Sequence, residues 1–170
     1  MTKKEFFMQK ALRQAAVALK YGEVPIGAVV VDAQGVVLGR AFNKVETVHT
    51  QTAHAEVLAI ARACKKNGDW RLNGCWLYVT LEPCLMCLGL IQLSRIEGVV
   101  FGAKSHLFGS RLHTGPQLPS YAKHLKVEGG IKEAESIALL KAFFKDVRKK
   151  RKDSRETACG VCSEDREGVK

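Results

Sequence analysis

Apolar residues recur with two different periods along the first part of the chain, and these predict a helix followed by two strands. The segment Thr2-Lys3-Lys4-Glu5 has the form of a capping box, which is typical of a helix start. Four apolar residues follow it at helical spacing: Met8, Leu12, Ala15 and Leu19. Two β-rich runs, at residues 24–32 and 36–42, then flank the turn Gln34-Gly35, which indicates a hairpin.

The rest of the chain alternates between short apolar runs and helical patterns. We expect, in order, a polar loop at 43–52, a helix at about 53–66, a strand at 76–81, a helix at 83–94, a strand at 98–101, a loop-rich segment at 105–120, a short strand at 124–127 and a last helix from 131 to about 152. The third and fourth strands are each separated by a helix, which demands parallel crossovers on a mixed sheet. The pattern therefore predicts a three-layer α/β/α fold on a five-stranded mixed sheet, within one domain at residues 1–152.

Composition agrees with a single soluble domain. The chain has 170 residues, of which 46% are hydrophobic. No apolar run approaches the roughly 18–20 residues that cross a bilayer, and the N-terminus lacks the apolar segment of a secretory signal. We expect a cytoplasmic protein with no membrane partner. Residues 153–170 are almost free of apolar side chains and predict a polar, disordered tail.

The formal net charge of +10 is high for this length and points to a polyanionic partner such as nucleic acid. Charge alone leaves open a basic protein without such a partner.

One group of residues has the composition of a metal site. His54 and Glu56 precede the segment Pro83-Cys84, and Cys87 follows three residues after Cys84. Histidine and cysteine are good zinc ligands, and a catalytic zinc usually takes three protein ligands and leaves one position open. Glu56 is then available to move protons at a water molecule in that position.

A closed structural zinc site is the alternative, and it would need a fourth ligand. The candidates are His49, Cys64 and Cys75. His49 belongs to a polar loop, and the two cysteines fit better as small core residues. We therefore favour an open site.

The spacing H-x-E followed by P-C-x-x-C resembles the zinc-dependent base and nucleoside deaminases. The flanking segments resemble the bacterial tRNA-specific adenosine deaminases, from about residue 5 to residue 150. They are E-V-P-I-G-A-V-V-V at 23–31, T-A-H-A-E at 52–56, L-Y-V-T-L-E-P-C at 77–84, V-V-F-G-A at 99–103, and V-E-G-G-I at 127–131.

This resemblance implies a homodimer that converts the wobble adenosine of a tRNA anticodon stem-loop to inosine, with one zinc ion per subunit. It implies that His54, Cys84 and Cys87 hold the zinc and that Glu56 carries protons. It also implies that Asn43 contacts the flipped base. Phe144 and Arg148 match residues that lie beside the anticodon loop in the family. The basic residues around them agree with this, although core packing for Phe144 and a solvated helix end remain alternatives.

The segment after Ala103 departs from the family. Lys104-Ser105-His106 stands where the family has an aspartate that contacts the substrate backbone. Ser105 keeps a hydroxyl group in that position but lacks the charge. We expect Ser105 to take part in substrate binding with altered contacts, and His106 to be either a substitute contact or a solvent-exposed residue.

Two other functions remain open. One is a deaminase of the same fold that acts on a free base or nucleotide, such as guanine or cytosine. The other is a non-catalytic tRNA-binding subunit, which is disfavoured because Glu56 is present. Cys159 and Cys162 resemble half a zinc knuckle, but no second ligand pair follows, so free thiols in a tail are the preferred interpretation.

Overall fold

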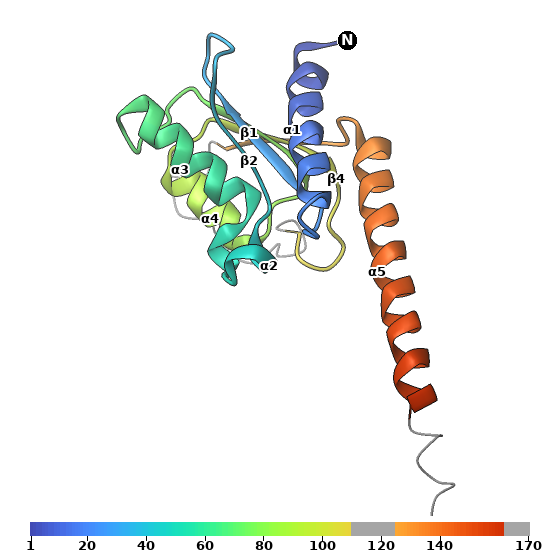
Figure 1. The fold of residues 1–170 in the computed structure, drawn as a ribbon. Helices are drawn as coiled ribbons and strands as arrows, with labels where there is room; N and C mark the ends of the chain where they lie inside the picture. The colour runs from blue at the N-terminus through green and yellow to red at the C-terminus, as the bar shows by residue number, and fades with distance from the viewer. Residues whose placement is uncertain (110–124, 162–170) are drawn as a thin grey trace, which may run out of the picture.

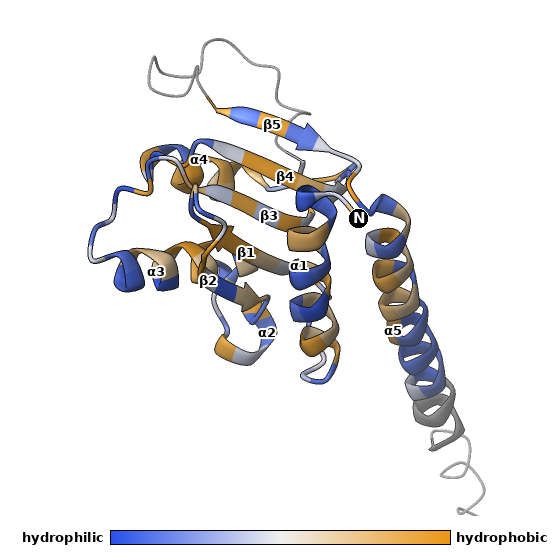
Figure 2. Ribbon diagram, turned by 90° about the horizontal axis from the view of Figure 1, so that it is seen from above, coloured by the Kyte–Doolittle hydropathy of each residue, from blue (hydrophilic) through white to orange (hydrophobic). Residues whose placement is uncertain are grey.

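The computed structural model describes residues 1–109 and 125–161, with side chains described as far as residue 155. Five strands form one mixed sheet in the order β2-β1-β3-β4-β5. The first three pair antiparallel, whereas β3, β4 and β5 run parallel. Figure 2 shows this order across the sheet. The predicted fold class is confirmed.

The elements follow the expected sequence with shifted ends. They are α1 (Lys3–Leu19), β1 (Gly27–Val31), β2 (Val37–Phe42), α2 (Val45–Val48), the 3-10 turn η1 (Gln51–Ala53), α3 (Ala55–Asn67), β3 (Trp76–Leu81), α4 (Leu85–Leu93), β4 (Gly98–Ala103), β5 (Lys126–Gly129) and α5 (Glu133–Val161). Figure 1 shows α5 extending beyond the body of the domain.

The sheet separates two apolar cores. The face covered by α3 and α4 buries Ala28 and Val30 of β1, whereas Val29 and Val31 of the same strand lie on the face covered by α1 and α5. This alternation is the period-2 pattern of a strand. Both faces of the central strands are therefore buried, which explains why β1 reads as a continuous apolar run.

Local signals in the sequence fix the ends of α1 and α3. Thr2 and Glu5 form the predicted capping box, with the Thr2 side chain accepting from the Glu5 amide. Gly68 ends α3 with a left-handed backbone conformation, at φ 70°. A residue without a Cβ atom adopts this conformation at no steric cost.

The edge strand β2 has two of its carbonyl groups occupied by side chains of α3. Arg62 Nη1 donates to the Arg40 carbonyl at 2.6 Å, and Lys66 Nζ donates to the Val37 carbonyl at 2.7 Å. Both cations come from the helix that packs on this strand. They satisfy acceptors that would otherwise face solvent at the sheet edge.

Three expectations differ from the structure. Pro83 is not the first helical residue, because Cys84 is the N-cap of α4 and keeps an extended conformation. The polar loop at 43–52 contains α2 and part of η1. The last helix continues past residue 152 to Val161, so part of the expected tail is helical, while residues 162–170 and most of the loop-rich segment lie outside the described residues.

Candidate active site

The start of α3 and the start of α4 meet at one end of the sheet. His54 is the N-cap of α3, and Cys84 is the N-cap of α4. Neither side chain caps its own helix, although the carbonyl of each accepts the first helical hydrogen bond, from Leu58 and Leu88. The imidazole and the thiol therefore point away from their helices and toward one another.

The three predicted ligands form one cluster. His54 Nδ1 lies 3.4 Å from Cys87 Sγ and 3.7 Å from Cys84 Sγ, and all three ligand atoms lie within 4.8 Å of one another. Zinc bonds to nitrogen and sulfur at tetrahedral angles place those two atoms about 3.6 Å apart. The donor set and its spacing fit one zinc ion.

Electrostatics in the cluster favour a bound cation. Hydrogen bonds from Cys87 and His54 lower the pKa of the Cys84 thiol to about 3. The pKa of Cys87 is raised, because its thiol is hydrogen-bonded to Cys84 and is buried beside Glu56. A divalent cation held by these residues would supply the charge that stabilises both sulfurs as thiolates.

Glu56 lies two residues after His54, yet both can serve one site. His54 has the extended N-cap conformation, with φ −60° and ψ 147°, and Glu56 is in the first turn of α3. Because His54 is outside the helix, the direction of its side chain relative to Glu56 is not set by helical geometry. The Glu56 side chain is only 4% exposed and contacts Cys87. Burial raises the pKa of its carboxyl group, which suits a group that both accepts and donates protons.

Asn43 directly follows β2, and a backbone hydrogen bond connects its segment to the segment that precedes His54. The amide of the next residue, Lys44, donates to the carbonyl of Ala53, which directly precedes His54. The Asn43 side chain is 4% exposed and donates to the carboxylate of Glu23. Glu23 was not singled out from the sequence. Its only distinguishing feature is the set of buried donors around its carboxylate, and these donors are distant in the chain.

Ser105 lies in the loop after β4, and its hydrogen bonds are to Glu82 and to Phe108 of the same loop. Its amide donates to Glu82 Oε2 at 3.2 Å, and its hydroxyl accepts from the Phe108 amide at 3.2 Å. Glu82 and Pro83 directly precede Cys84 of the cluster. The divergent loop is thus attached to the segment that leads into the metal cluster.

Phe144 and Arg148 line a hollow beside that loop. It has a volume of about 400 Å³ and lies between the end of β4 and α5, where Lys104, His106 and Lys141 also contribute. Phe144 is 44% exposed, whereas the adjacent Phe143 is more deeply placed. Lys104 and Lys141 are cations that the sequence alone did not assign to this place.

The remaining candidate ligands are not part of the cluster. Within residues 1–109 and 125–155, the only His, Cys, Asp and Glu group that fits a metal is His54, Cys84 and Cys87. His49 is exposed at the end of α2, Cys75 is buried in the core under α3, and Cys64 packs against the same core. The side chains of Cys159 and Cys162 lie outside the described part of the chain.

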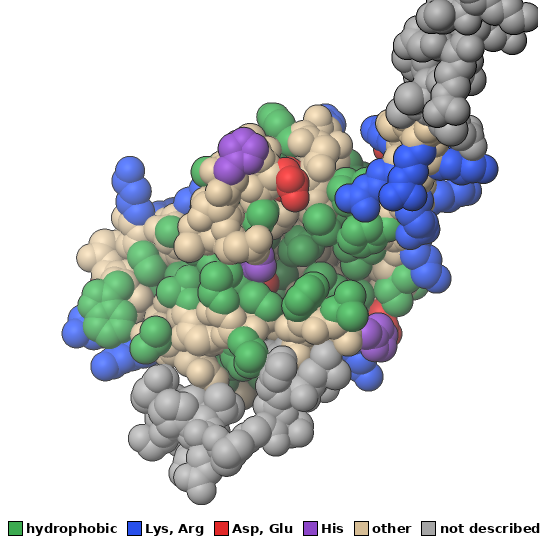
Figure 3. Space-filling model, turned by 90° about the horizontal axis from the view of Figure 1, so that it is seen from below, with side chains coloured by type: hydrophobic (Ala, Val, Ile, Leu, Met, Phe, Trp, Pro, Cys, Tyr) green, Lys and Arg blue, Asp and Glu red, His purple; other side chains and the backbone are tan. Residues whose placement is uncertain are grey.

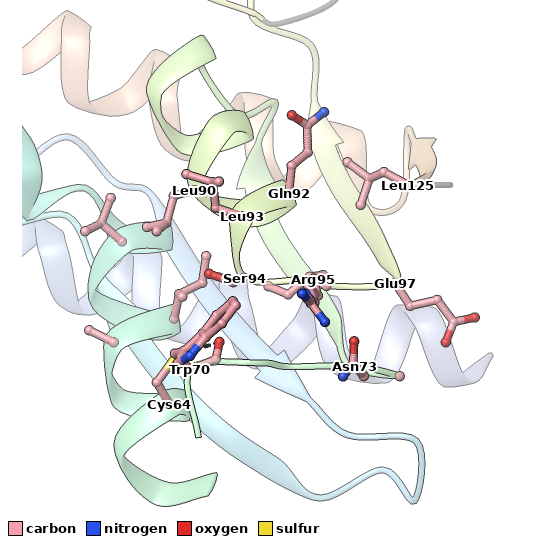
Figure 4. Close-up of a pocket in the computed structure, with 15 residues that line it drawn as sticks. Cys64, Trp70, Asn73, Leu90, Gln92, Leu93, Ser94, Arg95, Glu97 and Leu125 are labelled. Atoms are coloured by element: carbon pink, nitrogen blue, oxygen red, sulfur yellow. Dashed lines mark hydrogen bonds between the residues drawn. The ribbon is translucent and has the colours of Figure 1, made fainter. Parts of the chain in front are cut away.

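A further hollow lies apart from the cluster of His54, Cys84 and Cys87. It has a volume of about 880 Å³ and runs between α3 and α4, where Trp70, Leu90, Leu93 and Arg95 are among its lining residues (Figure 4). On the face seen in Figure 3, apolar side chains gather around a recess in which a histidine and an acidic side chain are visible.

The zinc-binding region of the cytidine and deoxycytidylate deaminases, as a family model, matches residues 1–103, which include all three cluster ligands and Glu56. The chain belongs to the cytidine and deoxycytidylate deaminase family.

Relatives of this deaminase extend the match to nearly the whole chain. A Bacillus subtilis (strain 168) protein named tRNA-specific adenosine deaminase is 45% identical over 159 residues, which are 92% of this chain and 98% of that protein. A solved structure from studies of A-to-I editing by tRNA:A34 deaminases is 39% identical with a TM-score of 0.72, covering 79% of this chain and 99% of that chain. The guanine deaminase from Bacillus subtilis is 40% identical with a TM-score of 0.56, but covers 59% of this chain and 64% of that chain.

The predicted family resemblance is therefore confirmed. The individual roles of Glu56, Asn43, Ser105, Phe144 and Arg148 remain predictions, which the geometry described above supports to different degrees.

Proposed function

We propose that this deaminase converts adenosine to inosine by hydrolysis at the wobble position of a tRNA anticodon loop, with one zinc ion per subunit. The observation that carries the proposal is the cluster of His54, Cys84 and Cys87 with the buried carboxyl group of Glu56 beside it. The substrate class rests on similarity to tRNA-specific adenosine deaminases over nearly the full chain.

His54, Cys84 and Cys87 hold the metal, which when bound acts as a Lewis acid that activates a water molecule. The water oxygen forms the new bond to C6 of the adenine ring, and the bond from C6 to the amino nitrogen breaks. Glu56 accepts the proton that the water loses and delivers it to the ring nitrogen next to C6. It then takes a second proton from the hydroxyl group on C6 and passes it to the departing amino group, so that ammonia leaves and C6 keeps a carbonyl oxygen. Its burial keeps these proton transfers away from bulk solvent.

The RNA backbone would pass along α5 and the loop after β4. Phe144 offers an exposed ring for stacking in the hollow that also contains Arg148 and Lys104. Farther along α5 lie Lys149, Lys150, Arg151 and Lys152. Figure 3 shows lysine and arginine side chains gathered along this helix next to the recessed face. Such a surface suits an anticodon stem-loop, whose phosphates extend away from the flipped base.

We also propose a homodimer formed through the surface of α3 and α4. This surface contains the hollow of about 880 Å³ together with exposed apolar side chains, among them Leu93 at 60% exposure. Gln92 lines the same hollow, and its buried Nε2 atom has no hydrogen-bond partner in the described structure. A second copy would cover the apolar groups of this surface.

A tRNA substrate implies that the enzyme works in the cytoplasm. Every described helix is too polar or too short to cross a membrane.

A guanine deaminase is the second candidate, favoured by the 40% identity to such an enzyme over part of the chain. A neutral free base needs no cationic surface, whereas residues 141–152 of α5 carry one acidic side chain, Asp146, against a run of lysine and arginine residues. Those cations are Lys141, Lys145, Arg148, Lys149, Lys150, Arg151 and Lys152. The charge of α5 therefore favours RNA.

The deciding experiment incubates the purified, zinc-loaded protein separately with an anticodon stem-loop carrying a wobble adenosine, with guanine and with cytosine. Inosine is read by sequencing, where it pairs as guanosine, and ammonia release is followed for all three substrates. We expect inosine in the RNA and a steep loss of activity as salt is raised, because phosphate contacts release counterions. Ammonia from guanine alone, with a weak dependence on salt, would establish the second candidate instead.

A further inference from the structure

Glu23 is a carboxylate that lies wholly inside the protein, at 0% exposure, at the mouth of the hairpin formed by β1 and β2. Its Oε1 atom accepts from the Thr47 amide and from the Thr47 hydroxyl, each at 2.7 Å. Its Oε2 atom accepts from Asn43 Nδ2 at 3.0 Å and from the Glu46 amide at 3.3 Å. In the described structure no lysine or arginine forms an ion pair with it.

Each partner of Glu23 is a donor, and a carboxylate only accepts. The amides of Glu46 and Thr47 cannot reverse their roles, so these two bonds fix the carboxylate in place. Its other two hydrogen bonds come from the Thr47 hydroxyl and from Asn43 Nδ2. A buried carboxylate with several donors is strongly held, because leaving any donor unpaired costs the desolvation energy of that group.

This arrangement determines which way the Asn43 carboxamide points. Only Nδ2 can face Glu23, because the carbonyl oxygen of Asn43 would be repelled by the carboxylate. The carbonyl oxygen and the second hydrogen of Nδ2 are thereby given fixed positions. The backbone is also fixed, since the Asn43 amide donates to the Ile26 carbonyl at 3.0 Å.

Asn43 and Glu23 are joined to the metal cluster by the backbone. Lys44, next to Asn43, donates to the Ala53 carbonyl at 3.0 Å, and the residue after Ala53 is the ligand His54. A change in the Asn43 side chain therefore occurs in a rigid frame that also holds the metal.

We infer that Glu23 is a positioning residue: it fixes the orientation of the Asn43 carboxamide, and so determines how the base is read without touching the base itself. The inference rests on the proposed function and on the family resemblance, which implies that Asn43 contacts the base. A carboxamide can distinguish the edge of one base from another only if its oxygen and nitrogen are not interchangeable. Glu23 removes that ambiguity.

The substitution Glu23→Gln tests this with little change in size. The substituted side chain can keep its oxygen toward the Thr47 donors. Its amide nitrogen then faces both Asn43 and the Glu46 amide, which loses its acceptor. Asn43 must in response turn its own oxygen toward that nitrogen, which reverses the groups that it offers to the base. We expect kcat/KM for the stem-loop to fall about tenfold or more, with zinc content unchanged.

A double-mutant cycle separates positioning from general support of the fold. If Glu23 acts on the base through Asn43, then adding Glu23→Gln to Asn43→Ala should change kcat/KM by less than about twofold. The inference is overturned if Glu23→Gln lowers kcat/KM by the same factor in both backgrounds, or if it leaves the wild-type background unchanged.

Two control variants lie in the same loop. Glu46→Gln removes an identical charge from an exposed side chain and keeps the backbone amide, so it should retain wild-type kcat/KM. Thr47→Val removes one hydroxyl bond to Glu23 and leaves Asn43 untouched, so it should lower the melting temperature with less effect on kcat/KM than Glu23→Gln. An equal loss of kcat/KM in Thr47→Val would overturn the inference in favour of simple loop support.

If Glu23→Gln alone does not fold, the pair Glu23→Gln with Asn43→Asp restores one donor facing one acceptor, with reversed polarity. The pair should fold and bind zinc but turn over slowly, since the carboxylate introduced by Asn43→Asp has no N–H group to offer; wild-type turnover would contradict the inference. A wild-type protein that forms no inosine would overturn the proposed function together with this inference. Active wild type with an unaffected Glu23→Gln would overturn the inference alone.

Discussion

Gly39 lies directly against the backbone of Ala59, so that β2 and α3 pack with no side chain between them at this point. A Cβ atom on Gly39 would be 2.1 Å from the Ala59 carbonyl oxygen and 2.8 Å from the Ala63 nitrogen. The same helix begins at His54 and carries Glu56. The distance of α3 from the sheet therefore sets the positions of His54 and Glu56.

Gly39→Ala should lower the free energy of unfolding by about 1–3 kcal/mol, because backbone atoms of α3 must move to admit the methyl group. Chemical denaturation measures this change. Gly89→Ala is the matched control: it lies within α4 with no atom within 4 Å of the added Cβ, and should stabilise by about 0.5–1 kcal/mol. Equal effects of the two substitutions would contradict the close packing.

Glu56→Gln should abolish deamination, with a loss of about 10²–10⁴-fold in kcat, and should keep the zinc. Because burial is the main cause of the raised pKa of Glu56, its removal should not lower the melting temperature. Inosine formation, zinc analysis and thermal denaturation are the measurements. Turnover close to that of the wild type would contradict the assigned role.

Cys87→Ser should lose zinc and, with it, thermal stability, since the metal binds the folded state through this buried sulfur. A chelator should lower the melting temperature of the wild type and not that of the variant. Cys64→Ser is the control, because Cys64 lies outside the cluster and its hydrogen bond to the Trp70 carbonyl can be kept by a hydroxyl group. Zinc loss in the control would show that the cluster is wider than three ligands.

Much of this candidate site could be predicted from the sequence, because the three residues of the cluster lie in short segments with strong local signals. The strand Trp76–Leu81 and the capping box at Thr2 were predicted to the residue. The extended backbone of Cys84, which turns its sulfur toward His54, was not, because proline is equally acceptable at the first helical residue or before the N-cap. The length of α5 was underestimated because a polar, exposed helix has no hydrophobic period.

Glu23 shows a second limit of sequence reasoning. Its partners are 20 to 24 residues away in the chain, and two of them are backbone amides that carry no residue-specific signal. Burial of a carboxylate depends on the path of the loop that brings those amides together, which periodicity does not reveal.

Arg148→Gln should weaken binding of the stem-loop and reduce the slope of log K against log salt by about 1, as expected for one lost phosphate contact. Fluorescence anisotropy over a salt series measures both. Lys65→Gln removes an equal charge from the last turn of α3, at the opposite end of that helix from His54, and should leave the slope unchanged. Identical slopes of log K against log salt for the two variants would show that the RNA does not contact Arg148.

Leu93→Glu should convert the proposed dimer to a monomer, because it puts a charge into the apolar surface of α3 and α4. Light scattering after size exclusion gives the mass directly. Val36→Glu, at an exposed apolar residue in the turn before β2, is the comparison and should keep the wild-type mass. A monomeric wild type would rule out the dimer.

The side chains of Arg62 and Lys66 have a consequence for how copies of this chain can meet. Their hydrogen bonds occupy two carbonyl groups of the edge strand β2, so these groups are not free to accept from a strand of a neighbouring molecule. Extension of the sheet past β2 is thereby disfavoured. Strand pairing between copies is then confined to the other edge of the sheet, at β5.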